Sequence, residues 1–190
     1  MILLYSILLI IVLHELGHLW AAKLFGCKVE RFSVGFGKVL WEKEWRGTVY
    51  QIALIPLGGF CKLQDELDFS LSSSAFTNLT YIQKVIVSYA GIGMNCWTAI
   101  IAYGLFMLTN NPVFAIFGFY SMAIGLSNAL PCPCLDGSYP VAFAFEKFWG
   151  KEKTYLFWKK INGHFFKWIM VLNILTLPYL IYMIWKGMIL

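Results

Sequence analysis

Four long apolar runs alternate with more polar stretches along the chain, at residues 1–25, 81–108, 112–131 and 165–190. A helix rises about 1.5 Å per residue, so runs of this length can cross the hydrocarbon core of a bilayer, which is about 30 Å thick. The pattern predicts a polytopic α-helical membrane protein with about four transmembrane helices.

A different pattern separates the first two apolar runs. Within residues 26–62, two stretches rich in β-branched and aromatic residues flank a polar segment, residues 42–47, that ends in glycine. This arrangement predicts a small membrane-associated β-hairpin or sheet between the first and second helices. Gly35 and Gly37 allow two interpretations, either as ordinary bulge or turn positions or as part of a bare strand edge to which another extended backbone can pair.

The remaining stretches are predicted to be connections and interfacial segments. Residues 63–80 are acidic and serine-rich, which indicates a solvated loop, and residues 109–111 form a very short uncharged link. Residues 132–140 are predicted to be a turn, and residues 141–164 a basic amphipathic segment on the cytoplasmic side.

Composition supports a membrane protein and narrows the classes of partner. The 190 residues are 59% hydrophobic and only 13% charged, which is far from an ordinary soluble domain. The net charge is +5, but Lys and Arg never form a run, so we expect a lipid bilayer and no nucleic acid as a partner. Five cysteines without a disulfide-dense character indicate reduced thiols in a reducing compartment.

The distribution of positive charge predicts the orientation. If the loops after the first and third apolar runs share a side, fourteen of the 15 Lys and Arg residues lie there and only Lys186 lies opposite. By the positive-inside rule that side is cytoplasmic. We therefore expect a multi-pass protein of a bacterial cytoplasmic membrane, with its N-terminus outside and its polar site toward the cytoplasmic side.

The first apolar run carries three ionisable side chains, those of His14, Glu15 and His18. Residues i and i+4 share one face of a helix, so the two histidines can bind one metal ion while Glu15 reaches a water molecule on it. Unpaired polar groups in an apolar helix are costly, which makes a chance motif with packed histidines the weaker interpretation. The motif predicts a zinc hydrolase.

The third apolar run ends in a segment, residues 128–137, in which Pro131 and Pro133 prevent a regular helix. Irregular backbone at membrane depth is tolerated where it lines a cavity or is buried in protein. Asp136 is therefore the best candidate for a third, anionic zinc ligand, ahead of Glu146 in the more polar stretch that follows.

Two other groups of residues leave alternatives open. Thiolates also bind zinc, so Cys132 and Cys134 are competing ligands, although we favour small residues packed around two prolines that point the thiols apart. Gly91 and Gly93 are of a type found where membrane helices approach closely, and we interpret them as packing positions. His164 is interpreted as an interfacial histidine without a metal role.

Taken together, these motifs resemble the site-2 protease family of intramembrane zinc metalloproteases. The matching segments are HELGH at 14–18, GFG at 35–37, IPLGGF at 55–60, Ala90-Gly91 with Asn95, and NALPCPCLDG at 128–137. The resemblance covers a core of residues 1–140. It implies one zinc ion per chain, held by His14, His18 and Asp136, with Glu15 as the catalytic base.

The same resemblance implies further roles around the site. It implies that Gly35, Phe36, Gly37 and Asn128 bind the substrate. It also implies structural roles near the site for Asn95, Pro131, Pro133 and Gly137. Many bacterial members carry a PDZ domain where this chain has only residues 109–111, which implies a compact form of the family. Ile92 and Ser138 stand where the family often has proline and glycine.

These observations lead to an expected function and an alternative. We expect hydrolysis of a peptide bond within or near the transmembrane segment of a single-span membrane protein or signal peptide, in regulated intramembrane proteolysis or clearance of signal-peptide remnants. The alternative is a non-proteolytic zinc-binding scaffold or transporter. A transporter should place polar groups through the full depth of several helices, whereas here they cluster toward one side. Substrate identity and oligomeric state stay open.

Overall fold

The computed structural model describes residues 2–64, 76–133, 135–150, 152–154, 156–161 and 164. The chain divides into two units, of which the first comprises Met1–Pro131 with Leu135–Val141 and contains the predicted metal ligands and the predicted catalytic base. The predicted transmembrane helix at 165–190 and Cys134 lie outside the described residues.

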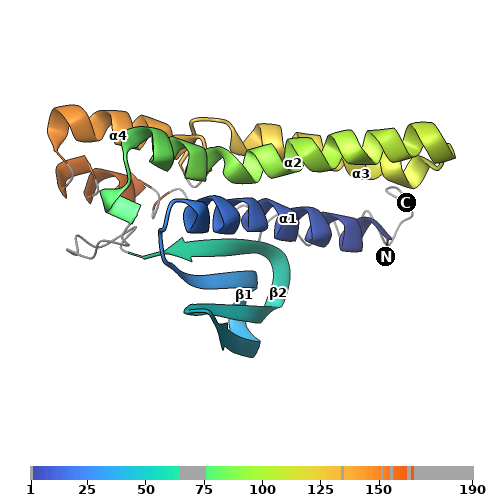
Figure 1. Cartoon of the computed structure of the whole chain (residues 1–190), viewed down its shortest axis with the longest axis horizontal. Helices are drawn as coiled ribbons and strands as arrows, with labels where there is room; N and C mark the ends of the chain where they lie inside the picture. Colours follow the sequence, from blue (N-terminus) through green and yellow to red (C-terminus); the bar gives the residue numbers. More distant parts are fainter. Residues whose placement is uncertain are drawn as a thin grey trace. The chain divides into compact units, whose positions relative to one another are not determined.

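The first unit combines apolar helices with a two-stranded antiparallel sheet (Figure 1). In chain order the elements are α1 (Ile2–Leu24), β1 (Val29–Trp45), β2 (Thr48–Leu63), α2 (Tyr81–Thr109) and α3 (Pro112–Asn128). Figure 1 shows the sheet on one side of α1 and α2 on the other, and α3 runs beside α2. A short 3-10 helix, Phe76–Asn78, precedes α2, and α4 (Ser138–Trp149) follows the turn after α3.

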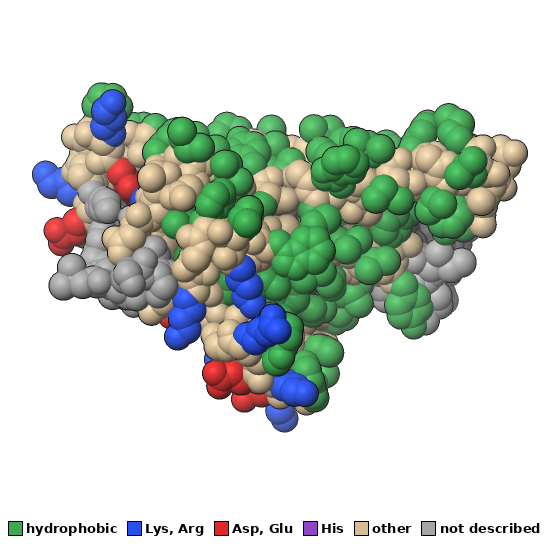
Figure 2. Space-filling view, viewed as in Figure 1, with side chains coloured by type: hydrophobic (Ala, Val, Ile, Leu, Met, Phe, Trp, Pro, Cys, Tyr) green, Lys and Arg blue, Asp and Glu red, His purple; other side chains and the backbone are tan. Residues whose placement is uncertain are grey.

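The helices present an apolar surface. Residues Tyr5–Leu24 and Tyr81–Thr109 are long and apolar enough to cross a membrane, and α3 is a shorter apolar helix of 17 residues. Large side chains such as Trp97 and Leu108 are exposed, and Figure 2 shows apolar side chains along the helices and charged ones on the hairpin. Such an extensive apolar surface fits contact with lipid. Helices at the first three predicted positions and the predicted sheet are therefore present, while the number of membrane spans stays a prediction.

The link between α2 and α3 is as short as the sequence predicted. Asn110 ends α2 in the left-handed region with a φ of 52°, and the Asn111 side chain accepts a hydrogen bond from the Val113 N–H at 3.0 Å. Pro112 is the first residue of α3, where its missing N–H is tolerated. Two residues thus join the helices and make them antiparallel neighbours.

Both strands bend, so the hairpin pairs in two registers. Residues 31–34 of β1 pair with residues 59–62 of β2 on one side and with residues 49–52 on the other. The bend in β1 lies at Gly35 and Gly37, whose φ angles of 91° and 86° are in the left-handed region that favours glycine. The glycines therefore allow β1 to fold over β2.

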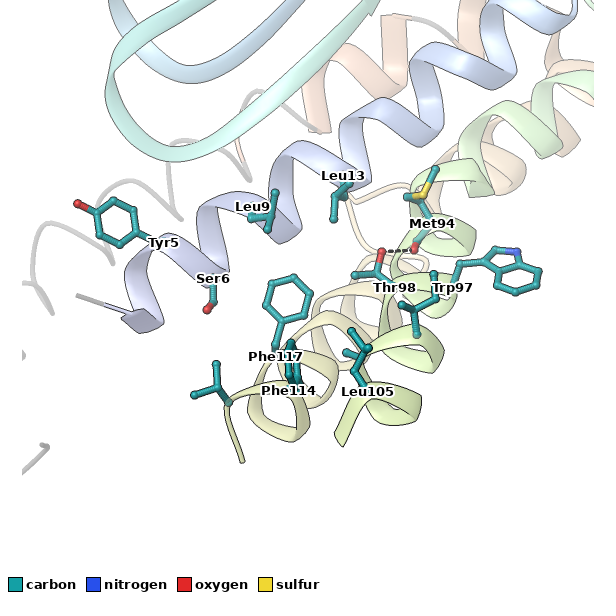
Figure 3. A pocket seen from close by; sticks show the side chains of 13 residues that line it. Tyr5, Ser6, Leu9, Leu13, Met94, Trp97, Thr98, Leu105, Phe114 and Phe117 are labelled. Carbon is teal, nitrogen blue, oxygen red and sulfur yellow. Dashed lines mark hydrogen bonds between the residues drawn. The ribbon is translucent and has the colours of Figure 1, made fainter. Parts of the chain in front are cut away.

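A groove of about 630 Å³ opens between α1, α2 and α3 (Figure 3). Apolar side chains such as Leu9, Leu13 and Phe117 line it, and the Thr98 hydroxyl donates a hydrogen bond to the Met94 carbonyl at 2.8 Å within α2. Because its lining is mostly apolar and the Thr98 hydroxyl is satisfied within α2, the groove suits hydrocarbon better than water.

Helices α1 and α2 approach closely at Gly17. An added Cβ at Gly17 would lie 2.8 Å from the Ala90 carbonyl carbon and 3.0 Å from Gly91 Cα. These are backbone atoms, so the clash cannot be relieved by rotating a side chain. The contact fixes where the His14–His18 turn of α1 lies along α2.

We expect Gly17→Ala to lower the free energy of unfolding by about 1–3 kcal/mol, because the added methyl group overpacks the helix contact. The measurement is thermal or denaturant unfolding of the purified protein in detergent with a chelator, followed by circular dichroism. Gly104→Ala on α2 is the matched control, since an added Cβ there meets nothing within 4 Å. Equal stability of the two variants would contradict the close contact.

Candidate metal centre

Three side chains from distant parts of the sequence meet beside α1. His14 and His18 are both buried, and their Nε2 atoms are 3.3 Å apart. Asp136 Oδ2 lies 2.9 Å from His14 Nε2 and 3.3 Å from His18 Nε2. One ligand atom from each residue lies within 4.8 Å of the others. The structure therefore brings together the three residues that the sequence predicts as zinc ligands.

Three features show that this cluster fits a metal ion. Asp136 Oδ2 is buried and has no hydrogen-bond partner among the described residues, despite its short distances to both imidazoles. An added Cβ at Gly91 would meet His18 Nε2 and lie 2.7 Å from His14 Nε2, so the glycine keeps space open beside both ligand atoms. Two imidazoles and a carboxylate are a donor set of catalytic zinc sites, which leave one coordination position open.

Neighbouring groups set the tautomer of His18 and the charge of Asp136. His18 Nδ1 lies 2.8 Å from the Val87 carbonyl oxygen, which can only accept, so in the neutral ring Nδ1 carries the proton and Nε2 has the free lone pair. Burial by itself raises the pKa of Asp136, but hydrogen bonds and positive charge from His14 and His18 in their protonated form outweigh it and lower that pKa to about 2. The carboxyl group is therefore an anion, the form that binds a metal.

The turn after α3 places Asp136 beside the two histidines. Helix α3 ends at Asn128, earlier than the predicted end at residue 131, because a proline at 131 disfavours the helical conformation of the residue before it. The Gly137 N–H donates a hydrogen bond to the Asn128 carbonyl at 2.8 Å, and an added Cβ at Gly137 would lie 2.6 Å from the Leu130 carbonyl oxygen. The chain thus folds back tightly on the end of α3.

Two of the three competing ligands, Cys132 and Glu146, are described by the structure and are not part of this cluster. Within the described part of the chain, His14, His18 and Asp136 form the one group of three or more histidine, cysteine or acidic residues arranged to hold a metal. Cys132 is a free thiol outside that group, and Glu146 lies on α4. Cys134 lies outside the described residues.

Glu15 is held by the sheet. Its carboxylate accepts a hydrogen bond from the backbone of Cys61 on β2. An added Cβ at Gly59 would lie 3.1 Å from Glu15 Cγ, so β2 packs directly on the predicted base. The two histidines contact α2, whereas the glutamate between them contacts β2.

The residues predicted to bind substrate occupy two other places. Gly35 and Gly37 form the bend of β1, and Phe36 stacks on Phe60 of β2 with ring centroids 6.3 Å apart. The Asn128 side chain donates a hydrogen bond to the Ile124 carbonyl at 3.2 Å within α3. A role in substrate binding stays a prediction for these residues.

Two residues of α2 face the histidines more directly than the sequence interpretation anticipated. Gly91, interpreted as a packing position, borders both Nε2 atoms, and Asn95, expected to be structural, has its Nδ2 3.2 Å from His14 Nδ1. Gly93, the other packing candidate, has nothing within 4 Å of an added Cβ. The sequence does carry one signal for these roles: residues 91 and 95 are four positions apart and therefore share one face of α2.

A buried His–His–Asp cluster with an adjacent glutamate on an apolar helix is a candidate metal centre. The sequence model of peptidase family M50 matches residues 2–112. The chain therefore belongs to peptidase family M50, the site-2 protease family.

Curated relatives and a solved structure agree with this assignment. The chain is 44% identical over 109 residues to Protease RseP of Yersinia pestis, covering 55% of this chain and 24% of that protein. It is 38% identical over 107 residues to Putative zinc metalloprotease Cj1068 of Campylobacter jejuni, covering 54% of this chain and 28% of that protein. The Site-2 Protease from Methanocaldococcus jannaschii matches the fold with a TM-score of 0.59 and 18% identity, over 94% of this chain and 70% of that chain. The chain thus spans about a quarter of the length of these curated relatives.

We expect Gly91→Ala to lower zinc affinity by at least about tenfold, because the added methyl group would meet both ligand nitrogens. The measurement is zinc content after dialysis, followed by competition with a chromophoric chelator. Gly93→Ala on the same helix is the matched control and should retain wild-type zinc content. If both alanine variants bind zinc like the wild type, Gly91 does not form the wall of the metal pocket.

Proposed function

We propose that this protein is an intramembrane zinc metalloprotease that hydrolyses a peptide bond within or near the transmembrane segment of a membrane-protein substrate. The observation that carries the proposal is the meeting of His14, His18 and Asp136 beside Glu15 in an apolar helix bundle. The names of the relatives, a protease and a putative zinc metalloprotease, support the same reaction class.

The three ligands would hold one zinc ion through His14 Nε2, His18 Nε2 and an Asp136 carboxylate oxygen. When bound, zinc supplies Lewis-acid chemistry, since it polarises a peptide carbonyl and lowers the pKa of water to about 7. Gly91 keeps the space beside the ligand nitrogens free for a reacting group.

Glu15 is proposed as the general base and acid. Its carboxylate takes a proton from the attacking water as the carbon–oxygen bond forms, and then gives that proton to the amine as the carbon–nitrogen bond breaks. The hydrogen bond from the Cys61 backbone holds this carboxylate in place. Because β2 packs against it, Glu15 is covered by protein on the side of the sheet.

The sheet is proposed to hold the substrate in an extended form. A transmembrane helix hides its carbonyl groups in its own hydrogen bonds, and unwinding it in lipid leaves backbone groups unpaired. Residues 59–62 of β2 pair with residues 31–34 of β1, and β2 packs directly on Glu15. An unwound substrate could add there as a strand beside Glu15, with Gly35–Gly37 and Asn128 as further contacts.

The substrate class follows from the membrane setting. We propose a single-span membrane protein or a signal-peptide remnant, cleaved toward the cytoplasmic side, in the lipid bilayer. Lys and Arg gather on the sequence segments that flank the proposed site, which supports this orientation.

We expect Glu15→Gln to abolish cleavage of a single-span substrate by the purified protein in vesicles, with a loss of at least about a hundredfold, because the amide cannot accept the proton. The variant should retain wild-type zinc content, since the ligands are unchanged. The readout is the appearance of a cleaved fragment with time, with a chelator-treated wild-type sample alongside. Equal product from wild type and variant would end the protease proposal.

A further inference from the structure

Asn95 is enclosed where α1, α2 and α3 meet. Its side chain is fully buried, and its Nδ2 lies 3.2 Å from His14 Nδ1 on α1. Ser121 on α3 donates a hydrogen bond from Oγ to the Asn95 backbone carbonyl at 2.9 Å, and an added Cβ at Gly125 would lie 3.0 Å from Asn95 Cβ. The amide is therefore confined between the first histidine ligand and α3.

The two histidines differ in what faces their second ring nitrogen. His18 Nδ1 faces a backbone carbonyl, which can only accept, so in the neutral ring its Nε2 has the lone pair that a metal needs. His14 Nδ1 faces a side-chain amide, which can donate through nitrogen or accept through oxygen. The proton arrangement of His14 thus depends on the orientation of Asn95.

The orientation that puts Nδ2 toward His14 leaves one atom unsatisfied. Asn95 Oδ1 is buried and has no hydrogen-bond partner among the described residues, as is also true of Asp136 Oδ2 on the other side of the same imidazole. A half-turn of the amide exchanges its oxygen and nitrogen, so Oδ1 then accepts from Nδ1–H, Nδ2 takes the former place of Oδ1, and His14 Nε2 is free to bind zinc.

We propose that Asn95 is a positioning residue that selects the metal-binding tautomer of His14 through its side-chain oxygen. This inference rests on the proposed function, because it assumes that His14 is a zinc ligand. It assigns Asn95 a specific chemical task, in addition to its place in the contact between α2 and α3.

The test compares three variants of the full chain, purified in detergent and stripped of metal. Asn95→Leu removes the acceptor at similar volume, Asn95→Asp keeps an acceptor oxygen, and Ser121→Ala removes the hydrogen bond from α3 to the same residue while leaving the amide in place. Zinc affinity is measured by chelator competition, the absorption spectrum of the cobalt-substituted protein reports ligand geometry, and circular dichroism checks folding.

We expect Asn95→Leu to raise the zinc Kd by about 10- to 100-fold and to change the cobalt spectrum. Asn95→Asp should rescue binding to within about threefold of wild type, because a carboxylate also accepts from Nδ1–H. Ser121→Ala should bind zinc like the wild type.

Each other outcome has a distinct meaning. Wild-type affinity in Asn95→Leu would overturn the inference, as would equal losses in Asn95→Leu and Asn95→Asp. Equal losses in Asn95→Leu and Ser121→Ala would assign Asn95 to helix packing alone and would overturn it as well. Failure of the wild-type protein itself to bind zinc would instead refute the proposed function, so the two failures are distinguishable.

Discussion

The constraint on which the rest of the structure depends is that polar side chains inside an apolar helix must find partners, because each unpaired group there costs several kcal/mol. Helix α1 carries His14, Glu15 and His18 within an otherwise apolar sequence. The partners come from three different elements, with Val87 and Asn95 from α2, Asp136 from the turn after α3 and Cys61 from β2. The packing of the first unit therefore brings hydrogen-bonding and ionic partners to the polar side chains of one turn of α1.

Short distances between backbones make these partners reachable. Gly17 lets α1 lie against Ala90 and Gly91 of α2, and Gly91 leaves room beside the histidine nitrogens. Larger residues would push α2 outward, and the 2.8 Å contact from His18 to the Val87 carbonyl would lengthen. The glycines in α1 and α2 therefore serve the polar cluster as well as helix packing, which matches the use of small residues at membrane helix interfaces.

Part of this arrangement was predictable because its signals are local. The i, i+4 spacing of His14 and His18 places them on one helix face. The prolines near Asp136 interrupt a helix whatever the tertiary structure around them. The roles of Gly91 and Asn95 were not predictable in the same way, because they depend on which face of α2 turns toward α1. The bend at Gly35 depends likewise on the pairing of β1 with two stretches of β2, which no short window of sequence specifies.

The spacing of the motif also explains why α1 lies between a sheet and a helix. Successive residues of a helix are rotated by about 100°, so Glu15 cannot share the face of His14 and His18. If the histidines face α2 and Asp136, the glutamate must face a different element, and β2 fills that place through Cys61 and Gly59. A strand is suited to this position because its backbone N–H groups can hold a carboxylate, as the Cys61 backbone holds that of Glu15. The pentapeptide thus requires two different neighbours for α1, and the hairpin inserted between the first two long helices supplies the second.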